Sequence, residues 1–315
     1  MATDETPSGS TVLITGGAGF IGSHLAAYYQ GKARVRILDN LRTGRIENLA
    51  GLNIDFIRGS ILDRALVRQA MQGVDYVFHL AAQVSVPESV RDPHTCMELN
   101  INGLLNVLEA AATAGVKKLC FASSAAVYGN NPTVPKHEDM EPEPCSPYAA
   151  SKLDGEYFCQ HFSESGRLQT VALRFFNVFG PRQDPAGPYG AAIPIFFREA
   201  LAGRPITIHG DGGQTRDFIY VRDIVDALAF VASSPSLTGV YNAGYGQQTT
   251  IFDVAYRIIK LTKSHSPIKH TAERPGDVRH SRAKVDRLFA AGWRPSGSLE
   301  SGLVAMHAAL LSTSQ

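Results

Sequence analysis

A tyrosine and a lysine four residues apart are well suited to proton transfer. Tyr148 and Lys152 lie in a segment where Pro147 is compatible with the first turn of a helix. The i, i+4 spacing places both side chains on one face of that helix. An ammonium beside a phenol favours the phenolate and lowers its pKa from about 10 toward the range of a general base. Surface helices carry such a pair by chance, so its meaning depends on its surroundings.

A serine upstream of this pair follows a predicted strand. Ser124 lies just beyond the strand predicted for residues 118–123. The carboxyl ends of parallel strands form the edge of an open sheet where ligands bind. The serine therefore makes a chance occurrence of the Tyr148–Lys152 pair less plausible.

A glycine-rich turn indicates a dinucleotide-binding site. Gly16, Gly19 and Gly22 follow the first predicted strand directly and open the first predicted helix. Such glycines allow a tight turn, a close approach of backbone N–H groups to a pyrophosphate, and close packing of helix on strand. No lysine follows Gly22 and Ser23 as a Walker A loop requires. The competing interpretation is a plain strand–helix turn.

An aspartate at the end of the second predicted strand specifies the cofactor. Asp39 lies 17 residues beyond Gly22, where a carboxylate can bind both hydroxyls of an adenosine ribose. The same carboxylate would repel the additional phosphate of NADP. The sequence therefore predicts NAD, although a strand-ending turn residue is the alternative interpretation of Asp39.

Strands and helices alternate through the first half of the chain. Strands are predicted at residues 11–15, 34–39, 54–58, 75–80, 118–123 and 170–176, and helices at 20–30, 63–71, 95–114 and 147–162. This alternation predicts the α/β class, with right-handed crossovers and a doubly wound parallel sheet of the Rossmann type. We expect a NAD-binding domain over residues 1–176, to which some later segments return.

The composition and the pattern of predicted elements change after residue 177. Residues 177–190 are rich in glycine and proline and predict an irregular loop. Beyond it we predict helices at 193–202, 223–232, 250–261 and 283–291 and strands at 206–209 and 218–221. Residues after Trp293 are predicted to form a tail of small residues. Residues 177–315 are expected to form a smaller α/β lobe, with the ligand in the cleft between the two parts.

The chain resembles the extended short-chain dehydrogenase/reductase superfamily, and within it the nucleotide-sugar epimerase/dehydratase family. It is most similar to UDP-hexose and UDP-N-acetylhexosamine 4-epimerases. The segments that carry the resemblance are residues 16–23, 39–40, 79–85, 100, 123–129, 148–152, 173–182, 208–218 and 274–277.

This resemblance implies roles for individual residues. The implied catalytic group is Ser124, Tyr148 and Lys152. The implied cofactor-binding residues are Gly16, Gly19, Phe20, Ile21, Gly22, Asp39, Asn40, Ile61, Leu80, Ala81, Ala82, Gln83, Asn100, Tyr148, Lys152 and Phe176. The implied contacts to a UDP-sugar are Ser85, Ser124, Asn177, Ile193, Ile208, Arg216, Arg274 and Asp277. Arginines suit the diphosphate because a guanidinium binds phosphate in a bidentate manner.

Three departures from the family pattern bear on the reaction. Ser60 replaces the acidic residue that usually binds adenine, and Asp63 or backbone groups are the expected substitutes. Ala126 occupies a position that is often a hydroxyl residue in galactose-type epimerases. Ala125 and Ala126 together replace the Asp-Glu pair with which similar 4,6-dehydratases remove water.

The resemblance implies transient oxidation of a UDP-sugar, of the UDP-GlcNAc type, at C4. The expected reaction is 4-epimerisation through a 4-keto sugar. The alternative is removal of water after the same oxidation, with Cys120, Glu143 or Cys145 as an unusual base. A regulatory protein that binds the cofactor without catalysis is disfavoured, because Ser124, Tyr148 and Lys152 are all present.

Composition excludes several other classes. Lys and Arg number 30 against 29 Asp and Glu, so no basic excess draws the chain to nucleic acid. No apolar run approaches the ~20 residues of a membrane span, and the polar start lacks a secretory signal. Four separate cysteines without CxxC, and histidines without HExxH, predict no metal site. We expect a cytoplasmic enzyme, and the resemblance implies a homodimer formed by the helices near residues 95–114 and 147–162.

Overall fold

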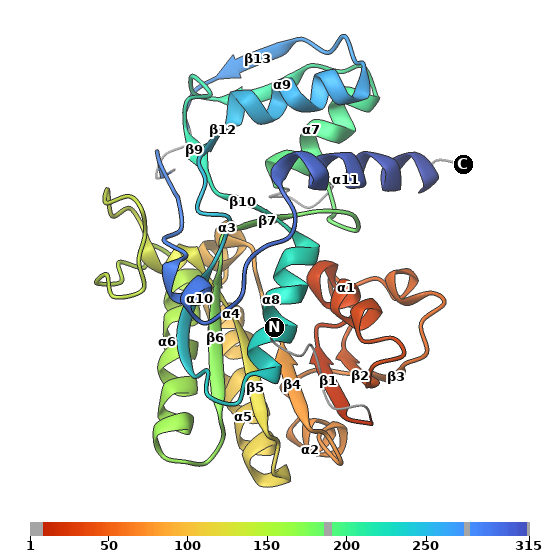
Figure 1. Cartoon of the computed structure of the whole chain (residues 1–315), viewed down its shortest axis with the longest axis vertical. Coiled ribbons are helices and arrows are strands. Elements are labelled where there is room, and N and C mark those ends of the chain that lie inside the picture. The colour runs from red at the N-terminus through yellow and green to blue at the C-terminus, as the bar shows by residue number, and fades with distance from the viewer. Residues whose placement is uncertain (1–8, 186–190, 274–277, 314–315) are drawn as a thin grey trace.

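The computed structural model describes residues 9–185, 191–273 and 278–313. Its main feature is a seven-stranded parallel sheet in the order β11-β6-β5-β4-β1-β2-β3 (Figure 1). The strands are β1 (Thr11–Thr15), β2 (Arg34–Asp39), β3 (Asp55–Arg58), β4 (Tyr76–His79), β5 (Lys118–Ser124), β6 (Thr170–Phe175) and β11 (Gly239–Ala243). This sheet confirms the predicted Rossmann-type class.

Helices cover both faces of the sheet because its central strands are buried on both sides. One face is covered by α1 (Phe20–Tyr28) and α8 (Val221–Ser233). The other is covered by α2 (Arg64–Ala70), α5 (Gly103–Ala114) and α6 (Pro147–Glu164). Between β4 and α5 the chain forms α3 (Val86–Arg91), α4 (Pro93–Met97) and a π-helical turn, Glu98–Asn102.

The second half of the chain contributes to this sheet as well as to a separate lobe. Strand β11 pairs in parallel with β6, with Tyr241 opposite Leu173, and forms one edge of the sheet. Helix α8 packs against β5 and β6. The outermost strand beside the catalytic elements therefore comes from residues far along the chain.

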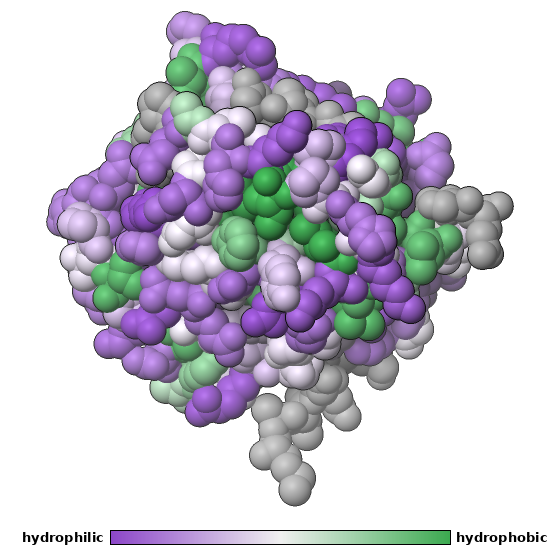
Figure 2. Space-filling view, turned by 90° about the horizontal axis from the view of Figure 1, so that it is seen from above, coloured by the Kyte–Doolittle hydropathy of each residue, from purple (hydrophilic) through white to green (hydrophobic). Residues whose placement is uncertain are grey.

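The smaller lobe lies above the sheet in Figure 1. Its helices are α7 (Ala192–Leu201), α9 (Ile251–Thr262) and α11 (Leu299–Thr313). Short pairings join β8 (Ile206–His209) to β13 (Ile268–Thr271), β9 (Thr215–Arg216) to β12 (Thr249–Thr250), and β7 (Asn177–Phe179) to β10 (Phe218–Tyr220). Helix α10 (Asp286–Ala290) lies against β11. Seen from above, the molecule is mostly hydrophilic, with a hydrophobic patch near the centre of the view and smaller ones toward its edges (Figure 2).

The sequence predicted a tail of small residues after Trp293 and no helix there, but the structure has one. Residues 299–313 form α11, and Leu299, Leu303 and Met306 are buried against the rest of the lobe. Their spacing of four and three residues is helical, but the small residues between them weaken the periodic signal in the sequence. No helix in the described part of the chain is long and apolar enough to cross a bilayer.

Candidate active site

The candidate catalytic group lies where the strands of the sheet end. Strands β4, β5 and β6 end at His79, Ser124 and Phe175, on the same edge. Helix α6 begins at this edge because Ser146 caps it, with its Oγ accepting the N–H of Ala149 at 3.1 Å. Pro147 occupies the first turn. Tyr148 and Lys152 therefore fall in the first two turns of a helix that packs on β5.

Direct contacts join α6 to the end of β5. The Lys152 Nζ donates a hydrogen bond of 2.8 Å to the carbonyl oxygen of Ala122. The Ser124 side chain hydrogen-bonds with the Tyr148 hydroxyl, and its Oγ accepts the N–H of Ala126 at 3.1 Å. The Lys152 Nζ lies 5.8 Å from the centre of the Tyr148 ring. The structure thus brings Ser124, Tyr148 and Lys152 together.

Burial opposes charge on this group. It raises the pKa of Tyr148, and the hydrogen bond with Ser124 acts in the opposite direction. Burial lowers the pKa of Lys152 to about 8. His79, whose Nδ1 lies 2.9 Å from the Thr15 Oγ1, has its pKa lowered to about 3 by burial and stays neutral. The phenol is therefore protonated near neutral pH unless a further positive charge approaches it.

The glycine turn closes tightly against the loop that follows β4. Gly16 has a φ of +72°, and a Cβ there would lie 2.8 Å from the Ala81 backbone nitrogen. A Cβ on Gly22 would lie 2.3 Å from the Gly16 carbonyl oxygen. Both positions require glycine, so the turn can expose its backbone N–H groups at the start of α1. Phe20 and Ile21 form the first residues of that helix.

Asp39 faces the same turn from the end of β2. Its carboxylate accepts the N–H of Ala18 at 2.9 Å and the N–H of Leu41 at 2.8 Å. These two bonds fix the carboxylate beside the glycine turn. The side chain of Asn40 points outward, and its Oδ1 accepts the N–H of Arg42.

The loop after β4, with Leu80, Ala81 and Ala82, carries a buried amide without a partner. Among the described residues, neither Oε1 nor Nε2 of Gln83 finds a hydrogen-bond partner. The Asn100 side chain holds the Gln83 backbone: its Oδ1 accepts the Gln83 N–H at 2.8 Å, and its Nδ2 donates to the Gln83 carbonyl oxygen at 3.1 Å. Since buried polar groups are normally paired, the free amide points to a ligand. With the glycine turn and Asp39, these residues fit a bound dinucleotide.

The residues near the expected adenine position pack against or hydrogen-bond other parts of the protein. Ile61 is buried and packs against Gly103 of α5. The Ser60 hydroxyl accepts the N–H of Leu62, and Asp63 caps α2 through the N–H groups of Ala65 and Leu66. The Asp63 carboxylate is therefore used by the helix that follows it.

A cavity of about 440 Å³ opens beside the catalytic group. Its polar lining includes Ser124, Tyr148, Asn130, Asn177 and Arg216. Its small and apolar lining includes Ala125, Ala126, Gly129, Phe176 and Val278. None of the described residues that line it is a carboxylate. The cavity therefore offers two candidate bases, Tyr148 and Cys145, and two basic side chains, Arg216 and Lys136.

Other predicted substrate contacts lie elsewhere. Ile193 and Ile208 are buried in the core of the smaller lobe, and Ser85 caps α3. None of the three lines the cavity. Arg274 and Asp277 lie outside the described residues. The roles predicted for these five residues stay predictions.

Sequence reasoning missed one wall of the cavity, residues 278–284, which we call the wall segment. Its backbone pairs with Thr215 on one side, through bonds of 3.0 and 3.1 Å, and with Lys136 on the other, at 2.8 and 2.7 Å. Val278 and Ser281 line the cavity. These pairings join residues far apart in the chain, so no local sequence pattern predicts them.

The structure separates the three candidate bases for dehydration. Cys120 is fully buried in the sheet, and burial raises its pKa to about 12. Glu143 is exposed outside the cavity lining, and its Oε1 accepts a hydrogen bond from Asn131. Cys145 alone of the three lines the cavity.

A larger cavity of about 620 Å³ lies between α1, α8 and α11. Its lining includes His24, Arg182 and Arg222, and it shares no residue with the cavity beside Tyr148. Because Ser124 and Tyr148 line only the smaller of these two cavities, we assign the chemistry to the smaller one.

Comparison with known proteins gives a consistent result. The model of the NAD dependent epimerase/dehydratase family matches residues 12–244. A UDP-glucose 4-epimerase from Mycolicibacterium smegmatis is 36% identical over 299 residues, which cover 92% of this chain and 95% of that protein.

Two solved structures are similar over almost the whole chain. A UDP-N-acetylglucosamine 4-epimerase from Methanobrevibacter ruminantium, in complex with UDP-N-acetylmuramic acid, has a TM-score of 0.94 and 40% identity, covering 97% of this chain and 99% of that one. A UDP-glucose 4-epimerase from Thermus thermophilus, in complex with NAD, has a TM-score of 0.88 and 38% identity, covering 96% and 99%.

Proposed function

Because the chain belongs to the NAD dependent epimerase/dehydratase family, we propose that it catalyses the 4-epimerisation of a UDP-sugar, with a UDP-GlcNAc-type sugar preferred. The coarser assignment follows directly from the family: the chain is an NAD-dependent nucleotide-sugar enzyme. The observation that carries the finer proposal is that Tyr148 and Ser124 line one cavity whose described lining contains no carboxylate. Lys152 lies behind them, bonded to the carbonyl oxygen of Ala122.

The residues of the catalytic group divide the proton chemistry between them. NAD, when bound, supplies the acceptor for the hydride of the sugar C4 and a positive charge near the phenol. Tyr148 takes the proton of the 4-hydroxyl on its phenolic oxygen and later returns it. Ser124 shares the hydrogen bond at that oxygen. Lys152 stabilises the phenolate through its ammonium.

The cavity favours epimerisation over dehydration. Removing water requires a base for the C5 proton and an acid for the leaving hydroxyl, whereas epimerisation requires proton exchange at the 4-oxygen only. Ala125 and Ala126 occupy the two positions next to Ser124 and cannot exchange protons. Ala125, Ala126 and Ser281 line the cavity, and we propose that these small side chains leave room for an N-acetyl group. For Arg216, we propose contact with the diphosphate, as its position on the cavity wall allows.

The test is to incubate the protein with UDP-GlcNAc and UDP-Glc separately in deuterated water. We expect an isomer of unchanged mass, without deuterium on carbon, and faster turnover of UDP-GlcNAc. The C4 hydrogen returns to the sugar, and C5 is never deprotonated. NMR identifies the isomer and mass spectrometry its mass.

Other products would contradict the proposal in distinct ways. A product lighter by one water would establish dehydration, and Cys145→Ala would then identify the base if it alone stops C5 deprotonation. If the protein loaded with cofactor turns over no UDP-sugar, the result would support the alternative of a regulatory protein that binds the cofactor without catalysis. Faster turnover of UDP-Glc would overturn only the preference for UDP-GlcNAc.

We also propose a homodimer formed through the helical segments 95–114 and 147–162, which correspond to the end of α4, the π-helical turn, α5 and α6. Met97 of α4 and Tyr157 of α6 are apolar or aromatic side chains exposed on neighbouring helices, and Tyr157 is 56% exposed. Light scattering at micromolar concentration should give the mass of two chains. Tyr157→Glu should shift the protein toward monomer, whereas a monomeric parent protein would refute the proposal.

A further inference from the structure

Three consecutive residues of β5 are each held by a different residue of α6. The carbonyl oxygen of Ala122 accepts a hydrogen bond from Lys152, and Ser124 bonds with Tyr148. Between them the Ser123 hydroxyl donates a short hydrogen bond to the Oε1 of Glu156. Glu156 follows Lys152 by four residues, so it lies one turn further along the same side of the helix.

Glu156 also forms a buried ion pair with the neighbouring strand. Arg174 of β6 lies opposite Ser123 in the register of the sheet. Its Nε donates to Oε1 at 2.8 Å and its Nη2 to Oε2 at 2.7 Å. The two side chains are 5% and 4% exposed. A buried pair of this kind gains little stability over apolar residues, because removing both charges from water offsets their attraction.

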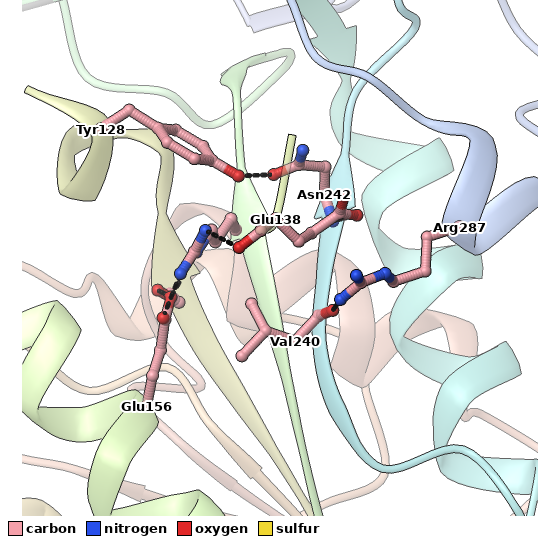
Figure 3. Close-up of polar contacts among 8 residues, drawn as sticks. Tyr128, Glu138, Glu156, Val240, Asn242 and Arg287 are labelled. Carbon is pink, nitrogen blue, oxygen red and sulfur yellow. Dashed lines mark hydrogen bonds and ion pairs between the residues drawn. The ribbon is translucent and has the colours of Figure 1, made fainter. Parts of the chain in front are cut away.

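Arg174 continues the network toward the cavity wall. Its Nη1 donates to the carbonyl oxygen of Glu138, and its guanidinium lies 4.8 Å from the centre of the Tyr128 ring. The Tyr128 hydroxyl donates to the Oδ1 of Asn242 at 2.7 Å (Figure 3).

Asn242 completes the connection to the wall segment. Its Nδ2 donates to the carbonyl oxygens of Lys136 and Lys284, at 2.9 and 3.1 Å. Lys284 ends the wall segment, and the Lys136 backbone pairs with it. A continuous buried network therefore runs from the helix that carries Tyr148 to the wall opposite it.

We propose that Glu156 and Arg174 are positioning residues that fix α6 against β5 and the wall segment, so that the Tyr148 hydroxyl meets Ser124 and the bound sugar. Neither Glu156 nor Arg174 lines the cavity beside Tyr148. The pair acts through the rotation and axial position of α6, and a displacement of ~1 Å at a reacting group can cost about 100-fold in rate. The inference rests on the proposed function for its kinetic test only.

The first test compares Ser123 of β5, which bonds Glu156 in the middle of α6, with Ser163 near the end of α6. Ser123→Ala removes the bond to Glu156 and leaves the ion pair in place. Ser163→Ala is the matched control, because its hydroxyl bonds Thr170 of β6 at 2.9 Å, near the end of α6 and away from Tyr148. We expect kcat to fall about fivefold in Ser123→Ala with KM nearly unchanged, and to stay within about twofold in Ser163→Ala. Equal kcat values in the two variants would overturn the proposal.

The second test removes the ion pair without leaving a lone charge. Glu156→Met combined with Arg174→Met should keep the unfolding temperature close to that of the parent, since apolar replacement of a buried pair is often neutral. We expect kcat to fall at least about tenfold in this folded protein. A parental kcat would overturn the positioning role. If the double variant does not fold, Ser123→Ala against Ser163→Ala decides.

A third measurement does not depend on turnover. The ionisation of Tyr148 is followed by ultraviolet difference titration, with Tyr148→Phe as the blank. The titratable groups that face the phenol are Lys152 and the Cys96 thiol. Loss of Ser123 or of the ion pair should move the phenol midpoint by about half a pH unit or more, whereas Ser163→Ala should leave it in place. An unmoved midpoint overturns the inference, while a moved midpoint without sugar turnover overturns only the proposed function.

Discussion

Two buried aspartates in different halves of the molecule each accept backbone N–H groups, one beside the glycine turn and the other at the wall segment. Asp39 accepts the N–H groups of Ala18 and Leu41, which lie 21 and 2 residues from it in the sequence, and remains 7% exposed. Asp217 is fully buried and accepts the N–H groups of Tyr245, Gly246 and Ala283 at 2.9 to 3.0 Å.

The difference shows how the two halves of the site are built. Asp39 joins the glycine turn to the end of β2, so the cofactor half is organised by contacts within the first 41 residues. Burial raises the pKa of Asp217 to about 6, although the backbone N–H groups that it accepts act in the opposite direction. Asp217 joins the segment after β11 to the wall segment, so the substrate half depends on long-range contacts.

Tyr148 stands between the two halves, so its loss should abolish turnover and spare both binding functions. We expect Tyr148→Phe to lower kcat by about 100- to 10,000-fold, the range for removal of a general base. Calorimetry should show that the variant binds the UDP-sugar and NAD with little change. Turnover close to that of the parent would remove Tyr148 from the role of base.

The cofactor half should decide the preference for NAD. NAD should bind far more tightly than NADP, because the Asp39 carboxylate would face the 2′-phosphate. Asp39→Asn removes this repulsion and should narrow the preference by about tenfold, equivalent to about 1.4 kcal/mol. Calorimetry with both cofactors measures it, with Asp217→Asn as the control that should keep the parental ratio. Tighter binding of NADP by the parent protein would defeat the argument.

The catalytic group should show an alkaline limit set by Lys152. Since burial lowers the pKa of Lys152 to about 8, its ammonium is lost as pH rises through that value, and kcat should fall. Lys152→Arg keeps its charge, because a guanidinium titrates above about 12, and should move the decline upward by more than about one pH unit. An unchanged decline in kcat–pH profiles would assign it to another group.

The lowered pKa of Lys152 also determines how this residue changes the free energy of unfolding with pH. Between pH about 8 and about 10.4 the unfolded chain holds more protons at Lys152 than the folded protein does. The contribution of this group alone therefore makes the free energy of unfolding rise with pH across that window. Denaturant titrations of the parent and of Lys152→Met at both pH values would isolate this contribution.

The substrate half should show the smallest effect on turnover. Asp217→Asn replaces one acceptor oxygen with a donor that faces backbone N–H groups, which should cost about 1–3 kcal/mol of stability. We expect KM for the UDP-sugar to rise about fivefold with kcat within about twofold, because the wall segment moves while Tyr148 stays in place. A change in NAD affinity equal to that in KM would show that the two halves are not separate.

Local patterns made part of the fold and site predictable. Strands Thr11–Thr15, Arg34–Asp39 and Ile206–His209 have the bounds expected from their apolar, β-branched residues. The glycine turn is readable because only glycine tolerates its backbone and close contacts. Tyr148 and Lys152 share a helix, so their spacing alone places both on one face. These features depend on backbone sterics and helical periodicity, which act over a few residues.

Tertiary structure alone decided the remainder. Nothing near residue 240 announces that β11 completes the sheet, or that the wall segment pairs with Thr215 and Lys136. Glu156 and Arg174 belong to different elements, and their ion pair exists only because α6 crosses β5 and β6 at that level. The resemblance already implied a cofactor contact for Gln83, but only packing buried its amide without a partner among the described residues. Such contacts come from the packing of distant segments, and their determinants are spread over the chain, so no short stretch of sequence contains them.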